Sequence, residues 1–364
     1  MSIEAASLAT PLHPLLREEI AREGGWLPFD RFMAQALYAP GLGYYANQTR
    51  KFGRMPSSGS DFVTAPEMTP LFGQALAVAV ADAMDATGCD EVWEFGAGTG
   101  ALASQLLGAL GDRVKRYTIV DLSGSLRERQ RETLAAHAGR VRWAGELPDD
   151  LRGIVVGNEV LDAMPVKLLA RAGGTWHERG VVVDGDGFAW EDRPTALRPP
   201  VEIEGGHDYL TEVHPQAEAF VRTLADRLKQ GAAFLLDYGF PEDAYYHPQR
   251  HMGTLMCHHL HQADPDPLVK VGLKDITAHV NFTGIALAAQ EAGLGVLGYT
   301  TQARFLINCG LVERMADASL QERVAAQRLV HEHEMGELFK VIGLHAGAFW
   351  DAVGFRHGDR TATL

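Results

Sequence analysis

The sequence predicts an α/β fold in which helices cover both faces of a largely parallel sheet. An apolar strand that contains Val92, Trp93 and Phe95 runs directly into glycines at every second position from 96 to 100. Apolar residues then repeat at helical spacing over 101–110, so a strand, a tight turn and a helix follow one another. Buried parallel strands that end at one polar edge are also indicated by later apolar runs at 117–120, 154–156 and 233–236.

Composition narrows the class of protein. The 364 residues are 46% hydrophobic and carry a formal net charge of −14, which indicates a globular chain and disfavours nucleic acid as a partner. Three scattered cysteines argue for a reducing compartment and against structural zinc. The longest apolar stretch, 71–84, is too short to span a bilayer, and the N-terminus lacks the apolar core of a signal peptide. We therefore expect a cytoplasmic bacterial protein without a membrane span.

The glycine turn is compatible with two kinds of ligand. The spacing Gly96-x-Gly98-x-x-Ala101 fits a dinucleotide fingerprint, so the glycines alone do not exclude NAD. Glu94, however, precedes the turn where a dinucleotide fold usually has an apolar residue. The order Glu94-x-Gly96-x-Gly98-x-Gly100 resembles motif I of class I S-adenosylmethionine (SAM) methyltransferases, in which the turn wraps the amino-acid part of SAM.

Residues after the next two strands complete the predicted cofactor site. Asp121 ends the strand at 117–120, where a carboxylate can accept both ribose hydroxyls. The strand at 141–143 leads into a loop that we expect beside the adenine. The predicted cofactor contacts are Glu94, Gly96, Ala97, Gly98, Gly100, Asp121, Leu122, Glu146 and Leu147.

A further polar segment follows the strand at 154–156. Methyl transfer from a sulfonium requires that donor and nucleophile be held close together and aligned. The Asn158 side-chain carbonyl can accept an N–H, and Glu159 and Asp162 can hold a cation such as guanidinium, which prefers bidentate carboxylate partners. The alternatives are that Asp162 caps a following helix and that Glu159 is a surface acid. We expect all three residues at the methyl acceptor, with Asn158 also at the cofactor.

Two histidine-rich stretches do not make a metal site. In 256–261 adjacent residues of an extended segment point in opposite directions, and no second cysteine or carboxylate has metal-ligand spacing. His331 and His333 are two residues apart and fall on different faces of a helix. We expect no metal, and we interpret 331–334 as a solvated helix face.

The chain divides into five predicted parts: an N-terminal helical and lid segment (1–85), the first half of the core (86–165), an inserted β-hairpin and helix (166–230), the second half of the core with a long substrate loop (231–310) and a C-terminal helical segment (311–364). Within them we expect Asp30 as a helix N-cap, a hairpin turn at 184–187, a polar loop at 240–275 and helix throughout 313–345.

Several segments, taken together and in order, resemble the MidA-like family of SAM-dependent methyltransferases. That family includes the mitochondrial complex I assembly factor that methylates an arginine of a core subunit. The matching segments span about residues 30 to 310 and are Leu37-Tyr-x-Pro40 with Gly43-Tyr-Tyr45, Asp61-Phe-x-Thr-Ala-Pro-Glu67 with Pro70-Leu-Phe-Gly73, Glu94 to Gly100, Asn158-Glu-x-x-Asp-Ala-x-Pro165, Asp237-Tyr-Gly239, Gly253-Thr254-Leu255, Asp275-x-Thr-Ala-His279 and Gln302-x-x-Phe-Leu306.

The resemblance implies a class I SAM-binding, Rossmann-like core with the segment 61–67 closing over the site. It adds Asp61, Thr64 and Pro66 to the cofactor contacts and His279 to the catalytic residues. It also implies a protein substrate methylated on arginine, with a respiratory complex I subunit as one candidate. Two positions depart from the family pattern: Asn281 stands where Asp is expected, and Ser60 where Gly is expected. If Asn281 faces the substrate, its missing charge weakens recognition of a cation there.

Three functions follow from these observations. The first is a SAM-dependent enzyme that methylates a protein side-chain nitrogen, and this is the function that we predict, with arginine as the acceptor. The second is an assembly factor or chaperone that binds SAM without turnover. The third is an NAD-dependent oxidoreductase, which would lack an obvious catalytic acid–base pair.

Overall fold

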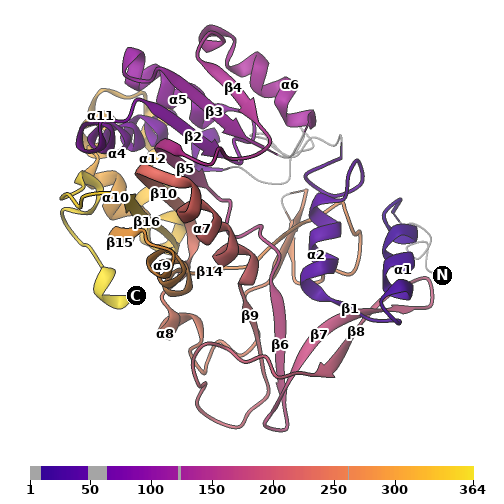
Figure 1. Cartoon of the computed structure of the whole chain (residues 1–364). Helices are drawn as coiled ribbons and strands as arrows, with labels where there is room; N and C mark the ends of the chain where they lie inside the picture. Colours follow the sequence, from indigo (N-terminus) through magenta and orange to yellow (C-terminus); the bar gives the residue numbers. More distant parts are fainter. Residues whose placement is uncertain (1–9, 48–63, 122–123, 261) are drawn as a thin grey trace.

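The protein has a sheet-and-helix core with a lobe beside it. The structure is a computed structural model that describes residues 10–47, 64–121, 124–260 and 262–364. Figure 1 shows the core, in which helices flank a twisted sheet, and the lobe, which carries helices α1 (His13–Arg22) and α2 (Phe29–Tyr38) next to long strands. The C-terminus lies on the core.

The core sheet has the strand order β4-β3-β2-β5-β10-β16-β15, with short β14 beside the end of β10. The strands from β4 to β10 are parallel, whereas β16 runs antiparallel to both of its neighbours. Their bounds are β2 (Glu91–Phe95), β3 (Arg116–Val120), β4 (Val141–Ala144), β5 (Leu151–Asn158), β10 (Leu228–Phe240), β14 (Val280–Asn281), β15 (Gly295–Thr301) and β16 (Phe339–Ala346).

Alternating side chains of the central strands supply two apolar layers, one on each face of the sheet. Ile154 and Val156 of β5 join one cluster of buried residues, and Val155 between them joins the other. Successive side chains of a strand point to opposite faces, so one apolar run serves both layers. The first layer includes α4 (Leu71–Thr87), α5 (Ala101–Leu110), α10 (Gln302–Asn308), α11 (Leu311–Asp317) and α12 (Leu320–Val330), and the second includes α7 (Pro215–Arg227) and α9 (Phe282–Glu291). The predicted α/β class, with helices on both faces, is therefore confirmed.

The expectation of helix throughout 313–345 is wrong. Helix α12 ends at Val330, and residues 339–346 form β16, which lies between β10 and β15 in the sheet. Five of the eight β16 residues are apolar, and all but the last are buried. Such a run packs on both faces of a sheet. The predicted last strand, 295–300, is present as β15, but it joins the sheet only through β16.

The lobe is an antiparallel sheet in the order β1-β7-β6-β9, with β8 paired to β7. Its strands are β1 (Leu27–Pro28), β6 (Lys167–Ala172), β7 (Thr175–Asp184), β8 (Gly187–Pro194) and β9 (Tyr209–Val213). The predicted hairpin turn lies between β7 and β8. Asp30 does not cap α2, because the N-cap position belongs to Pro28. Its carboxylate instead pairs with Lys167 at 3.2 Å.

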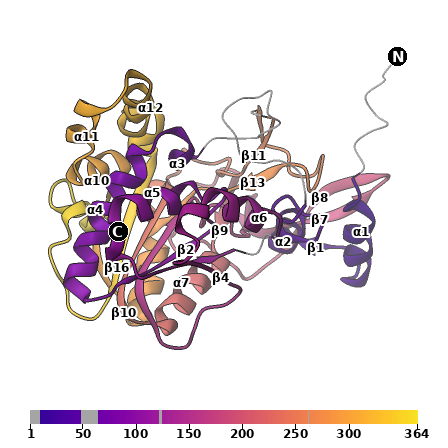
Figure 2. The same ribbon diagram turned by 90° about the horizontal axis from the view of Figure 1, so that it is seen from above.

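The stretch 240–275 is more ordered than a loop. It contains α8 (Glu242–Tyr245) and strands β11 (Met256–His259) and β12 (Gln262–Asp264), and β13 (Asp275–Thr277) completes a small sheet. This small sheet lies between core and lobe in Figure 2. Among the helices that the structure describes, none is long and apolar enough to cross a bilayer.

Candidate active site

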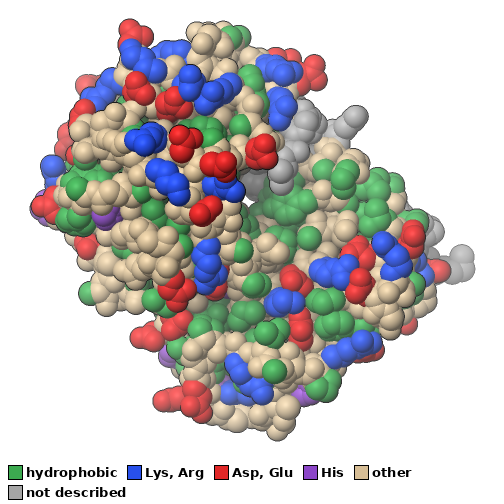
Figure 3. All heavy atoms as spheres, viewed as in Figure 1, with side chains coloured by type: hydrophobic (Ala, Val, Ile, Leu, Met, Phe, Trp, Pro, Cys, Tyr) green, Lys and Arg blue, Asp and Glu red, His purple; other side chains and the backbone are tan. Residues whose placement is uncertain are grey.

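A cavity of about 1500 Å³ opens where the carboxyl ends of the core strands face the lobe. Figure 3 shows this side of the molecule as a hollow with hydrophobic side chains along the lobe. In an open parallel sheet, ligands bind beyond the carboxyl ends of the strands. The cavity is lined there by residues at the carboxyl ends of β2, β3, β5 and β10 or just after them, and on the other side by residues of the lobe and of β11 and β13.

The glycine turn forms one wall of the cavity. Gly96, Gly98 and Gly100 have φ angles of 63°, 53° and 84°, in the left-handed region that favours glycine. Gly96, Ala97 and Gly98 line the cavity. Gly100 does not; a side chain there would meet Leu134 and Gln130 inside the protein. Three of the four predicted turn residues are therefore accessible to a ligand in the cavity. Gly100 is instead the N-cap residue of α5.

Glu94 is almost completely buried, with 2% of its surface exposed, at the base of the cavity. The Tyr117 hydroxyl donates to its carboxylate at 2.8 Å. Burial raises the pKa of Glu94 to about 8, although this hydrogen bond acts in the opposite direction. Its predicted contact with the cofactor stays a prediction.

Gln130 connects the glycine turn to Asp121, and sequence reasoning missed it. Its fully buried amide donates to the Gly98 carbonyl at 3.0 Å and to the Asp121 carboxylate at 2.8 Å, and it accepts from the Trp143 indole at 2.7 Å. Asp121 lines the cavity at the end of β3, as predicted. Gln130 lies on the polar helix α6 (Gly124–Thr133), where a single glutamine gives no sequence signal.

Substitution of Gln130 by methionine should weaken SAM binding about tenfold. Methionine keeps the volume of the side chain but removes both donors, so Asp121 and the Gly98 carbonyl lose their common anchor. Titration calorimetry with SAM measures the change. The exposed Gln290 on α9, changed to methionine, is the matched control. Unchanged affinity in the Gln130 variant would show that the anchor is dispensable.

The short helix α3 (Ala65–Met68) lies against the glycine turn. The Thr99 hydroxyl donates to Glu67, and the Gln105 amide of α5 donates to the Pro66 carbonyl at 2.7 Å. Thr64 and Pro66 line the cavity, and their contact with the cofactor stays a prediction. Asp61 and Leu122 lie outside the described residues, so their predicted roles stay predictions.

Asn158 is the last residue of β5, and Glu159 follows it directly. The Asn158 amide donates to the Glu159 carboxylate at 3.0 Å, and the backbone of Ala65 in α3 also hydrogen-bonds to Glu159. Glu159 has a φ of 55°, in a region that costs energy for any residue with a Cβ. Burial is the main cause that raises the pKa of Glu159 to about 8, and the charge of Asp162 is the second cause. A strained, partly buried acid that lines a cavity is typical of a functional position.

Asp162 is directed at the cavity by Asp237 and Tyr238. Asp237 accepts the backbone N–H groups of Val160, Leu161 and Asp162 at 3.1, 2.8 and 3.2 Å, and so fixes the turn after β5. Tyr238 donates its hydroxyl to one oxygen of Asp162, while the other oxygen is buried without a partner among the described residues. Burial raises the pKa of Asp162 to about 6. Asp162 therefore does not cap a helix, and that alternative is wrong.

The far end of the cavity combines aromatic, acidic and imidazole groups. Tyr38 and Tyr45 stack with ring centroids 5.6 Å apart, and Tyr45 donates to Asp275 at 2.8 Å. His279 lines the same end, with its ring against Tyr238. Burial, together with the charges of Arg250 and Lys340, lowers the pKa of His279 to about 4, so the imidazole is neutral near pH 7. The tyrosines and Asp275 belong to the family-like segments, which were the available sequence signal.

Besides Gly100, three residues singled out from the sequence lie away from the cavity lining. Glu146 is exposed, and Leu147 packs beside the second apolar layer, so their contact with the adenine stays a prediction. Asn281 is the N-cap of α9 and accepts from the Gly284 N–H at 3.3 Å. It is not among the lining residues, so the concern about lost charge at the substrate does not apply to this structure. No group of three or more metal-ligating side chains is present in the described part of the chain.

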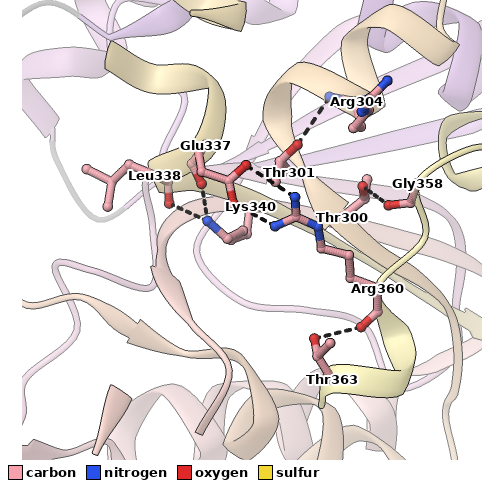
Figure 4. A network of polar contacts seen from close by, with 9 residues as sticks. All are labelled: Thr300, Thr301, Arg304, Glu337, Leu338, Lys340, Gly358, Arg360 and Thr363. Atoms are coloured by element: carbon pink, nitrogen blue, oxygen red, sulfur yellow. Dashed lines mark hydrogen bonds and ion pairs between the residues drawn. The ribbon is translucent and has the colours of Figure 1, made fainter. Parts of the chain in front are cut away.

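The C-terminal segment supplies the last wall. Arg328, Met335, Leu338 and Phe339 line the cavity between α12 and β16. The buried Lys340 donates to the Leu338 carbonyl at 3.2 Å and to the carbonyl of Glu337, whose carboxylate pairs with Arg360 near the C-terminus (Figure 4). Residues 331–334 are exposed, as predicted, but they lie at a kinked turn, η4 (Glu332–Gly336), and not on a regular helix. This turn returns the chain to the cavity.

The cavity residues fit SAM. The buried Asn158 side-chain oxygen has no partner within the described residues and can accept from an ammonium group. The glycine turn leaves room for a ligand to approach its backbone. Asp121 lines the cavity at the end of β3, where a carboxylate can accept the hydroxyls of a ribose. The strand order, the antiparallel β16 and this site together define a class I SAM-dependent methyltransferase.

Comparison with known proteins assigns the family. Residues 75–300 match the family described as "Putative S-adenosyl-L-methionine-dependent methyltransferase", and the chain belongs to this family. A superfamily member from Burkholderia thailandensis, crystallised with S-adenosyl-homocysteine, is 52% identical, with a TM-score of 0.94 and coverage of 97% of this chain and 96% of that chain. The chain is thus a SAM-dependent methyltransferase, and the predicted family resemblance and cofactor are confirmed.

More distant relatives carry a more specific name. Protein arginine methyltransferase NDUFAF7, mitochondrial, from Danio rerio is 28% identical, covering 85% of this chain and 81% of its own length. The Homo sapiens protein of that name is also 28% identical, covering 92% of this chain and 84% of its own length. These two relatives are therefore similar to this chain over most of its length.

Proposed function

We propose that this methyltransferase transfers the methyl group of SAM to a guanidinium nitrogen of an arginine in a protein. The observation that carries the proposal is the acidic end of the cavity, where Glu159, Asp162 and Asp275 meet beside Tyr38 and Tyr45. A planar guanidinium pairs with several carboxylates at once and stacks on aromatic rings. The names of the more distant relatives also support arginine as the acceptor.

The residues of the chain have separate tasks in this proposal. SAM supplies an electrophilic methyl group when it is bound. Glu159 and the unpartnered oxygen of Asp162 hold the guanidinium and align one nitrogen with the donor. That nitrogen loses a proton on methylation, and the Glu159 carboxylate, with its raised pKa, is placed to accept it. Neutral His279 adds no competing positive charge.

Transfer of label tests the proposal. The protein is incubated with SAM that carries a labelled methyl group and with lysate protein, and mass spectrometry then locates the label. Methylated arginine is the expected product, and a respiratory complex I subunit is the first acceptor to examine. Label on lysine or on an oxygen atom would contradict the choice of acceptor. SAM binding with no transfer to any acceptor would favour the assembly factor without turnover.

The pH profile should identify Glu159 as the group that receives the proton. Its carboxylate is the active form, so kcat/KM for the acceptor should rise as the pH increases through about 8, the pKa of the free enzyme's Glu159. In Glu159→Gln this rise should vanish together with most of the activity. If the wild-type profile stays flat between pH 7 and pH 9, in the neighbourhood of that pKa of about 8, the assignment of Glu159 is wrong.

A further inference from the structure

The charges around the cavity are strongly unequal. Six lining residues carry carboxyl groups: Glu67, Glu94, Asp121, Glu159, Asp162 and Asp275. Among the described lining residues, Arg328 is the one with a side chain that is always cationic. SAM carries its own α-carboxylate at the amino-acid end. A carboxylate that is taken out of water is held best by a cationic partner.

Arg328 lies on the side of the cavity that holds the glycine turn. Its helix α12 packs against α3, and the two helices are neighbours in Figure 2. Helix α3 is in turn tied to the turn by the Glu67–Thr99 hydrogen bond and to α5 by Gln105. In class I enzymes the amino-acid part of SAM is expected at this turn. Arg328 therefore lines the cavity from a helix that packs beside α3, the helix tied to this turn.

The Arg328 side chain is oriented but accessible. Its Nε lies 3.4 Å from the Glu334 carboxylate, and its side chain is 59% exposed. Glu334 is held by the η4 turn, in which the Glu334 and Gly336 N–H groups donate to the His331 carbonyl at 3.1 and 2.9 Å. An arginine that uses Nε for one carboxylate still has its two terminal nitrogens for another.

We propose that Arg328 binds the α-carboxylate of SAM through these terminal nitrogens. The proposal concerns donor binding only and does not depend on arginine being the acceptor. It also explains why a C-terminal segment, far in sequence from the glycine turn, forms part of the cavity wall.

Calorimetry with two ligands tests the proposal. The first is S-adenosyl-homocysteine, and the second is its analogue that lacks the carboxylate. Wild-type protein should bind the complete ligand about ten- to a hundredfold more tightly, the usual effect of a charged hydrogen bond. In Arg328→Met this ratio should fall to about one, because only the complete ligand loses affinity. Arg323→Met, exposed on the same helix and outside the cavity lining, should keep the wild-type ratio.

Two further variants cover the other outcomes. Glu334→Gln removes the competing carboxylate and should leave the affinity for the complete ligand equal or higher. Arg328→Lys keeps the positive charge but cannot bind a carboxylate through two nitrogens at once, so the ratio of the two affinities should be intermediate. This result supports the proposal if the methionine variant fails to fold. The proposal is overturned if Arg328→Met keeps its affinity for S-adenosyl-homocysteine, or if it loses affinity for both ligands equally. Either result is obtained without any acceptor, so it leaves the proposed function untouched.

Discussion

Substitution of Glu159 by glycine is expected to abolish methyl transfer without destabilising the fold. Glycine at a φ of 55° relieves roughly 1–2 kcal/mol of left-handed strain. Glycine also gives the unfolded chain greater conformational freedom, which lowers the free energy of unfolding by about 0.5–1 kcal/mol. The free energy of unfolding should therefore stay equal or rise slightly, whereas the acceptor loses its carboxylate. Thermal unfolding and label transfer measure the two effects.

Lys270 provides a matched control for this strain. It is exposed, is absent from the cavity lining and also has a φ of 55°. Lys270→Gly should give a similar small change in stability with normal transfer. If Glu159→Gly transfers methyl groups at the wild-type rate, Glu159 is not at the acceptor. If that variant is instead destabilised by several kcal/mol, the strained conformation serves the fold.

Substitution of Gly98 by valine is expected to abolish SAM binding. The φ of 53° at this position is strongly unfavourable for a β-branched residue, and the added methyl groups lie beside the cavity that Gly98 lines. Shifting the turn would also displace the carbonyl that Gln130 holds. We expect at least a hundredfold loss of affinity, of the order of 3 kcal/mol, measured by calorimetry with S-adenosyl-homocysteine.

Gly88 separates backbone strain from loss of the site. It is left-handed, with a φ of 70°, and a side chain there would meet nothing within 4 Å. Gly88→Val should therefore lose stability while it keeps SAM affinity. Normal binding by Gly98→Val would remove the glycine turn from the cofactor site.

The sequence predicted the parts of the site that depend on local pattern. Three glycines at 96–100 join a strand to a helix in immediate succession. Asp121 directly follows one strand, and Asn158 stands at the end of another. Because the carboxyl ends of parallel strands share one edge, their convergence follows from the fold class alone.

The remaining parts depend on tertiary contacts that no local pattern records. Gln130 looks like any polar residue of an exposed helix until Trp143 and Asp121 enclose it. Arg328 reaches the cavity because the η4 turn and β16 bring the C-terminal segment back across the sheet. Residues 339–345 belong to the stretch predicted as helix, but the structure shows them as strand. A short apolar run has no period that separates a buried strand from a buried helix.

The position of β16 between β10 and β15 also determines when, during synthesis, the exposed edge of β10 is covered and no longer promotes aggregation. The ribosome releases both neighbours before the strand that joins them, so the nascent chain exposes the unpaired edge of β10 for about a hundred residues of translation. An open hydrophobic edge recruits strands from other chains. A chain that ends before Phe339 would contain every predicted SAM-binding residue. Without β16 to cover the edge of β10, we expect chaperones and proteases to act on it before it becomes an enzyme.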